Sequence, residues 1–149
     1  MAKVGYQHFL YVNTGTIPAP TWTEVDLARD VTLNREKTEI DATSRATARG
    51  GWTATEDGLK SFTAEFESLY DPGNPAFDAL EAAFDANTDV DVLVLDGAVS
   101  VDGSAGVRVT CGVFGGNRSE PLNDVVTVNY SLKNKDVPAS GTVTGGVFS

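Results

Sequence analysis

The sequence predicts a mainly β domain, arranged as a β-sandwich or split barrel with one flanking α-helix. Strand-like stretches at 30–41 and 59–70 enclose a long polar connection at about 42–58. Apolar and polar residues alternate in the second of these stretches and again at 126–133, as in strands with one buried face. One amphipathic stretch, at about 75–86, has the spacing of a helix. Together these observations indicate a sheet covered by a single helix.

The N-terminal region is predicted to form a first strand at 4–12. Large side chains occupy both faces of that strand, so the pattern leaves open which face is buried. A loop follows at 15–20, because its two prolines lack backbone N–H donors. The next stretch, 22–28, is open between helix and strand: its apolar residues have helical spacing, but the stretch is short.

The stretch 59–70 predicts the orientation of its strand. Phe62, Ala64 and Phe66 alternate with polar residues and predict a face on the core. Glu65 and Glu67 fall on the opposite face, which is therefore expected to be wet and acidic. A slip of one residue would exchange the two faces, so the alternation specifies the register.

The helix at about 75–86 has a well-defined beginning. Asn74 is a favourable N-cap, and Pro75 occupies the first helical position. We expect one stripe of the helix to pack on the sheet, made of Phe77, Leu80 and Phe84.

The C-terminal half is predicted to add strands at 90–95, 98–101, 107–114 and 126–133. The chain is expected to form one domain, 1–149, since its length suits a single core. The N-terminal strand and the glycine-rich tail 138–149 are expected to become ordered only on assembly, against a neighbouring copy.

The charge distribution argues against nucleic-acid binding. The net charge is −10, and ten acidic residues lie between Ser61 and Val107 with no lysine or arginine among them. Such a field repels phosphate, although for any single acid a solvated surface position is the simpler role. The single cysteine, Cys111, excludes an internal disulfide and is expected to be a small buried residue of a chain that folds inside a cell. No run of 18 apolar residues occurs, so no membrane partner is expected.

The sequence lacks the usual motifs for catalysis and ligand binding, so we expect a protein that is not an enzyme and needs no cofactor or metal. His8 is the only histidine, and no nucleophile-elbow Gly-x-Ser-x-Gly accompanies it. Neither a zinc-type Cys/His cluster nor a glycine motif for phosphates or dinucleotides occurs. The stretch 85–96 partly mimics a calcium loop, but Val90 stands where the turn glycine is required and begins a strand.

Four short segments carry a resemblance to a known family. They are Asp30-Val-Thr-Leu-Asn34, Glu39-Ile-Asp-Ala-Thr-Ser-Arg45, Gly51-Trp52 and Gly58-Leu59, all within 22–70. In this pattern the chain resembles the major tail tube proteins of long-tailed bacteriophages. Related tube proteins occur in prophages, gene transfer agents and contractile injection systems, and the chain is similar to these as well.

The resemblance implies a structural virion protein that forms hexameric rings, stacked into a hollow tube through which DNA is delivered. It implies that the loop at 42–58 contacts the adjacent ring, with Arg45, Arg49 and Trp52 as candidate contacts. It also implies that an acidic strand face lines the lumen. The candidate lumen residues are Glu65 and Glu67, with Glu36 and Glu39 as weaker candidates because they lie on opposite faces of a regular strand.

The implied partners are further copies of the chain and the tape measure, terminator and distal tail proteins. DNA would pass the lumen without specific binding, because acidic side chains repel its phosphates. The implied location is the virion tail, after assembly in the cytoplasm of the bacterial host. Two alternatives stay open: another virion β-domain, such as a head decoration or tail terminator protein, and a small acidic binding or enzymatic domain.

Overall fold

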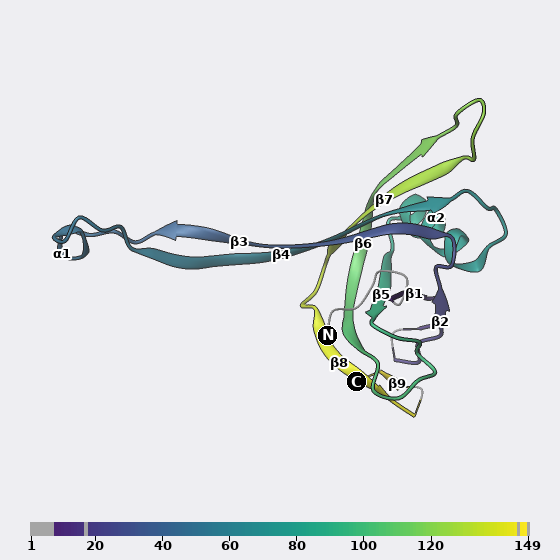
Figure 1. Ribbon diagram of the computed structural model, residues 1–149, viewed down its shortest axis with the longest axis horizontal. Helices are drawn as coiled ribbons and strands as arrows, with labels where there is room; N and C mark the ends of the chain where they lie inside the picture. Colours follow the sequence, from purple (N-terminus) through teal and green to yellow (C-terminus); the bar gives the residue numbers. More distant parts are fainter. Residues whose placement is uncertain (1–7, 17, 146, 149) are drawn as a thin grey trace.

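The computed structural model describes residues 8–16, 18–145 and 147–148, which form a mainly β structure (Figure 1). Its elements are β1 (Phe9–Asn13), β2 (Trp22–Glu24), β3 (Ala28–Asp41), α1 (Arg45–Ala48), β4 (Thr55–Leu69), α2 (Pro75–Ala86), β5 (Asp89–Leu95), β6 (Ala105–Ser119), β7 (Thr127–Asn134), β8 (Ala139–Thr144) and β9 (Val147–Phe148). The predicted mainly β fold with one substantial helix is confirmed, and α1 is an additional single turn.

The strands form an antiparallel sheet that stays open. Its main path runs β2-β1-β5-β6-β7-β4-β3, so β2 and β3 stand at its two ends and the sheet is not closed into a barrel. The long strand β6 pairs with β5 along one edge and with β7 and then β8 along the other. Among the described residues, the short strand β9 pairs only with β8.

Several local predictions are refined by the structure. The predicted first strand begins at Phe9, and residues 4–7 lie outside the described residues. The stretch 22–28, which the sequence leaves open between helix and strand, contains the strand β2, which pairs with β1. The strand predicted at 98–101 is wrong: this stretch forms turns, in which the Ser104 hydroxyl donates to the Ala98 carbonyl at 2.9 Å. Local polar bonds of this kind satisfy the backbone without a ladder.

Helix α2 begins and ends as its sequence predicts. The Asn74 side chain accepts hydrogen bonds from the N–H groups of Ala76 and Phe77 at 3.1 and 3.2 Å, which caps the helix. Asn87 ends the helix in the left-handed conformation, with φ of 56°.

The buried stripe of α2 differs from the prediction at one position. Phe77 and Leu80 are buried, as expected, but Phe84 is 44% exposed. In the last turn the small Ala83 takes the buried position instead. The expectation of Phe84 as a core residue is therefore wrong, and α2 carries an aromatic ring on its outside.

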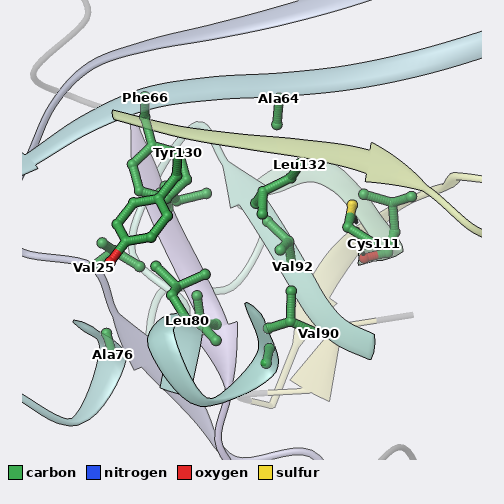
Figure 2. Close-up of a cluster of buried hydrophobic side chains, with 14 of the residues drawn as sticks. Val25, Ala64, Phe66, Ala76, Leu80, Val90, Val92, Cys111, Tyr130 and Leu132 are labelled. Atoms are coloured by element: carbon green, nitrogen blue, oxygen red, sulfur yellow. Dashed lines mark hydrogen bonds between the residues drawn. The ribbon is translucent and has the colours of Figure 1, made fainter. Parts of the chain in front are cut away.

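The main core lies between α2 and one face of the sheet. Figure 2 shows Leu80 of α2 close to Val90 and Val92 of β5, with Tyr130 and Leu132 of β7 above them. Each fully buried aliphatic or aromatic side chain contributes about 1.5–3 kcal/mol to folding. This cluster therefore holds α2, β4, β5, β6 and β7 together as one body.

A smaller apolar cluster lies on the opposite face of β5. It consists of Tyr11, Leu93, Leu95, Val143 and Phe148. Successive strand residues face opposite sides, so β5 contributes Val90 and Val92 to one cluster and Leu93 and Leu95 to the other. Val143 of β8 and Phe148 of β9 bring these two C-terminal strands onto this face.

The outer part of the β3–β4 hairpin projects from this body as a two-stranded arm, residues 36–61 (Figure 1). Every β3 residue after Ala28 is exposed, and the first buried residue of β4 is Phe62. Because Asp41 pairs with Thr55, the connection spans only 42–54, which is shorter than the predicted 42–58. The predicted strand 30–41 agrees with β3, but β4 begins four residues before the predicted 59 because its outer end buries no side chain and shows no apolar alternation.

Candidate assembly surfaces

The arm is held straight by backbone pairing and by polar contacts. The register runs from Val31 opposite Phe66 to Asp41 opposite Thr55, with an irregularity between Lys37 and Glu39. At that irregularity the Thr38 hydroxyl accepts from the Leu59 N–H at 2.9 Å and donates to the Leu59 carbonyl at 3.3 Å. An ion pair of 3.3 Å joins Lys37 to Asp57.

Gly58 permits the close approach of the two arm strands at this irregularity. A Cβ on Gly58 would collide with the Thr38 hydroxyl and lie 2.7 Å from the Thr38 carbonyl oxygen. Only glycine fits between the strands here without a shift. The arm therefore keeps this irregularity at a defined position without help from a core.

The arm tip, residues 42–54, has its own local structure. Ser44 and Thr47 form a capping box around α1, in which the Ser44 N–H donates to the Thr47 hydroxyl at 2.7 Å. The Thr43 hydroxyl accepts from the Ala54 N–H at 2.9 Å and so fastens the two ends of the tip. Hydrogen bonds from the Thr43 side chain and N–H lower the pKa of the Asp41 carboxyl.

The three residues predicted to contact the adjacent ring all lie in this tip. Arg45 and Arg49 are the first residue and the C-cap of α1, one turn apart, and Trp52 is 79% exposed. Within the described part of the chain, neither arginine forms an ion pair. The structure thus brings the three residues together at an exposed point, but it contains no second copy that would test the contact.

Three of the four predicted lumen residues share one face, the polar face, of β3, β4 and β7. Thr32 pairs with Glu65 and Glu36 with Ser61, so Glu36 and Glu65 project to the same side. Glu67 lies on that side too, opposite Asn129 of β7, and is 3.9 Å from Arg29. Glu39 belongs to the other face, as strand geometry predicts. The polar face continues across Ser131 and Lys133 of β7.

One acid of the strongly acidic segment is buried, which the sequence did not reveal. Asp91 is 4% exposed and accepts a hydrogen bond from Arg108 Nε at 2.9 Å. The Arg108 guanidinium also lies 5.2 Å from the centre of the Trp22 ring. This group ties β2, β5 and β6 together. The neighbouring Cys111 is buried as predicted, and burial, with a smaller effect of Asp91, raises the pKa of its thiol to about 12.

A cleft of about 690 Å³ marks the place where the sheet is open. Its walls come from β1, the β2–β3 turn and the free edge of β3, and include His8, Leu10, Asp30 and Leu33. Within residues 8–16, 18–145 and 147–148, β3 pairs only with β4, so its outer edge keeps unpaired backbone groups. Such an edge can accept a strand of another chain.

The described residues contain no group of three or more His, Cys, Asp or Glu side chains that could hold a metal ion. Across the same part of the chain, no helix has the length and apolarity to cross a membrane. The prominent exposed features are therefore the arm, the polar face and the open sheet edge.

The comparisons with known proteins agree with one another. A family model described as phage tail tube protein matches residues 2–138. The fold is similar to a chain in the tail of an empty gene transfer agent particle with C6 symmetry, at TM-score 0.74 and 13% identity, covering 93% of this chain and 98% of that one. It is also similar to the SPP1 tail tube, at TM-score 0.76 and 11% identity, covering 95% of this chain and 81% of that one.

A more distant likeness reaches a chain in the baseplate of the anti-feeding prophage, at TM-score 0.59 and 10% identity, with 99% of each chain covered. A comparison of the sequence with curated proteins finds no match.

Proposed function

The chain belongs to the phage tail tube protein family, and we propose that its copies form six-membered rings that stack into the hollow tube of a virion tail, through which DNA passes. As a member of this family it is a structural component of a virion tail that assembles with its own copies into a tube. The ring size, the contact residues and the passage of DNA are the parts that we propose.

The observation that carries this proposal is the arm. At about 3.4 Å per residue, the stretch 36–41 alone extends about 20 Å beyond the body. A compact chain of this length has a radius of gyration of about 15 Å. The arm therefore projects by more than the body's own radius and can reach a neighbouring copy. In this proposal Arg45, Arg49 and Trp52 of the tip make the contact between rings.

The open sheet edge supports ring closure. In the proposed ring, the free edge of β3 pairs with an edge of the adjacent copy, which removes an exposed strand edge from every subunit. A head-to-tail contact of this kind closes into a ring when its rotation is a whole fraction of a turn. The polar face with Glu36, Glu65 and Glu67 then lines the lumen, where its carboxylates keep DNA from adhering. Glu39 lies on the other face and is left out of this lining.

The remaining expectations form part of the same proposal. The chain acts as one domain, with no catalytic activity, and is assembled in the cytoplasm of the bacterial host. Its further partners are the tape measure, terminator and distal tail proteins, which such a tube needs at its inside and ends.

Electron microscopy of the purified chain tests the proposal. We expect hollow tubes, or rings with six-fold symmetry, when the protein is concentrated. A chain that stays a monomeric globule at high concentration would contradict the proposal. Rings of another symmetry would refute the six-membered ring but not the assembly into a tube.

A further inference from the structure

We propose that the arm tip of one copy docks on the exposed side of helix α2 in a copy of the next ring. This inference rests on the proposed function, because it names the surface that receives the arm. We call that surface the helix face, and it consists of Asp78, Glu81, Ala82, Phe84 and Asp85.

The two surfaces lie at opposite ends of the molecule. Figure 1 shows the arm tip with α1 at one end of the long axis and α2 at the other. The arm of a copy therefore points away from its own α2. When identical copies repeat along this axis in the same orientation, each tip meets the α2 end of the next copy, which is a head-to-tail contact.

The two surfaces carry opposite charges. The arm tip, 42–54, contains Arg45 and Arg49 and no acidic residue. The helix face contains three carboxylates, and the whole segment from Ser61 to Val107 has no lysine or arginine. Complementary charges of this kind steer association and set the register of an interface. The same charges disfavour a nucleic acid on the helix face.

The spacing between charged residues is also the same on the arm tip and on the helix face. Arg45 and Arg49 are four residues apart around the single turn of α1, so both side chains project from one side of it. Glu81 and Asp85 are likewise four residues apart on α2, and Asp78 precedes Glu81 by three. In both helices such positions bring the Cβ atoms to within about 5–6 Å of each other. Two arginines can therefore face Asp85 and the second carboxylate oxygen of Glu81, whose first oxygen accepts from the Tyr130 hydroxyl.

Each surface has an exposed aromatic ring beside its charges. Trp52 of the tip is 79% exposed, and Phe84 of α2 is 44% exposed although the other large apolar side chains of its helix, Phe77 and Leu80, are buried. A ring pair supplies the apolar centre that a charged rim needs in a stable contact. The proposed interface accordingly pairs Trp52 with Phe84 and both arginines with the carboxylates around it.

Cross-linking tests the contact directly. We expect the double variant Thr53→Cys with Ala82→Cys, which keeps both aromatic rings, to form a ladder of disulfide-linked oligomers in assembled tubes, while each single variant forms none. Cys111 is buried, with the pKa of its thiol raised, and stays out of the reaction. The matched control is Thr53→Cys with Asp124→Cys, which places the second cysteine on the β6–β7 loop. A ladder from this control and none from the Ala82 pair would overturn the inference.

Charge reversal gives an independent test. Arg45→Glu with Arg49→Glu should reduce the mass of tubes at least about tenfold. Each ion pair is weak, but every subunit of a ring repeats it, so the losses add up over the contact between two rings. Asp85→Lys with Ala82→Lys should do the same, and the four changes together should restore tubes. The control Asp124→Lys should assemble like the original chain.

The outcomes separate the two proposals. If the arginine variants assemble normally, the arm contact of the proposed function fails, and the inference fails with it. If the arginine variants are blocked but the α2 variants assemble normally, or the combination gives no rescue, the arm stacks rings on another surface and only this inference is wrong. Circular dichroism of each variant shows that the monomer remains folded.

Discussion

At the residue scale, the informative side chains are those whose exposure differs from what their chemistry leads one to expect. Trp52 and Phe84 are aromatic and exposed, while Asp91 is acidic and buried. Asp91 is explained within the chain by Arg108, which neutralises it beside the Trp22 ring. The two aromatic rings have no such explanation in the monomer. Exposed aromatic rings are typical centres of protein–protein contacts, so we assign these two to the proposed assembly contact.

The first prediction concerns Trp52. Trp52→Ala should block the stacking of rings and leave the melting temperature of the monomer unchanged, because the ring contacts no core residue at 79% exposure. The measurement is tube formation by electron microscopy, with thermal unfolding in parallel. Leu122→Ala is the matched control, since Leu122 is 97% exposed on the other projecting hairpin. Tubes of normal length from Trp52→Ala would remove this residue from the interface.

The second prediction concerns Tyr130, whose hydroxyl donates to Glu81 at 2.6 Å and links β7 to α2. Burial, and then the Glu81 carboxylate, raise the pKa of this phenol above its ordinary value near 10. A raised pKa in the folded state means that the neutral phenol stabilises the fold below about pH 10, and that this stabilisation is lost as the pH rises further.

Tyr130→Phe should therefore lower the free energy of unfolding by about 0.5–1.5 kcal/mol at pH 8. The difference between the two proteins should shrink above about pH 10, because only the original chain loses the contribution of this phenol there. Urea unfolding of both proteins at pH 8 and at pH 11 measures this difference in the free energy of unfolding. A difference that stays constant over this range would show that the Tyr130 phenol has no raised pKa.

At the element scale, the arm shows that a hairpin can be ordered without a core. Its backbone ladder, the Thr38 contacts with Leu59 and the capping box of the tip replace apolar burial. A lone two-stranded hairpin is only marginally stable in water. The arm is stable because its two strands continue into the sheet, where Phe62, Ala64 and Phe66 of β4 are buried.

The third prediction removes this element. Replacing residues 37–60 by Asn-Gly joins Glu36 to Ser61, which pair in the sheet, through a favourable two-residue turn. We expect a change of at most about 1 kcal/mol in the free energy of unfolding, because the deleted residues bury no core side chain. The shortened chain should form rings but no tubes, as judged by electron microscopy. Tubes built from it would show that stacking uses another element.

At the scale of the whole molecule, the sheet separates two surfaces with different roles. One face is covered by α2 and the core, and the other carries Glu36, Glu65 and Glu67. Two-residue periodicity keeps the two sets apart along every strand. In a closed ring, the second face would surround a channel with negative charge.

The fourth prediction tests this channel. Glu65→Lys with Glu67→Lys should still give tubes, since only the weak 3.9 Å pair of Glu67 with Arg29 is lost. DNA delivery by virions that carry the variant should fall, because lysines retain phosphate. Glu39→Lys, on the opposite face, is the control and should deliver normally. Normal infectivity of the double variant would discredit the assignment of the lumen.

The sequence by itself determined the secondary structure where a buried face is long and regular, as in the inner part of β4 and in α2. The alternation around Phe62–Phe66 and the Asn74–Pro75 start of α2 predicted orientation and boundary correctly, because burial and capping act on neighbouring residues. The family resemblance likewise depended on local segments and is confirmed by the match over 2–138. The contact residues of the tip and the lumen remain predictions.

Only the tertiary structure decided the features that depend on distant residues. The outer end of β4, residues 55–58, buries no side chain, so pairing across the arm, and not periodicity, makes it a strand. The exposure of Phe84 and the burial of Asp91 follow from what the sheet covers, which spacing along one segment does not contain. The placement of the arm tip and α2 at opposite ends is the outcome with the largest functional consequence, since in the proposed tube it lets one copy reach the next.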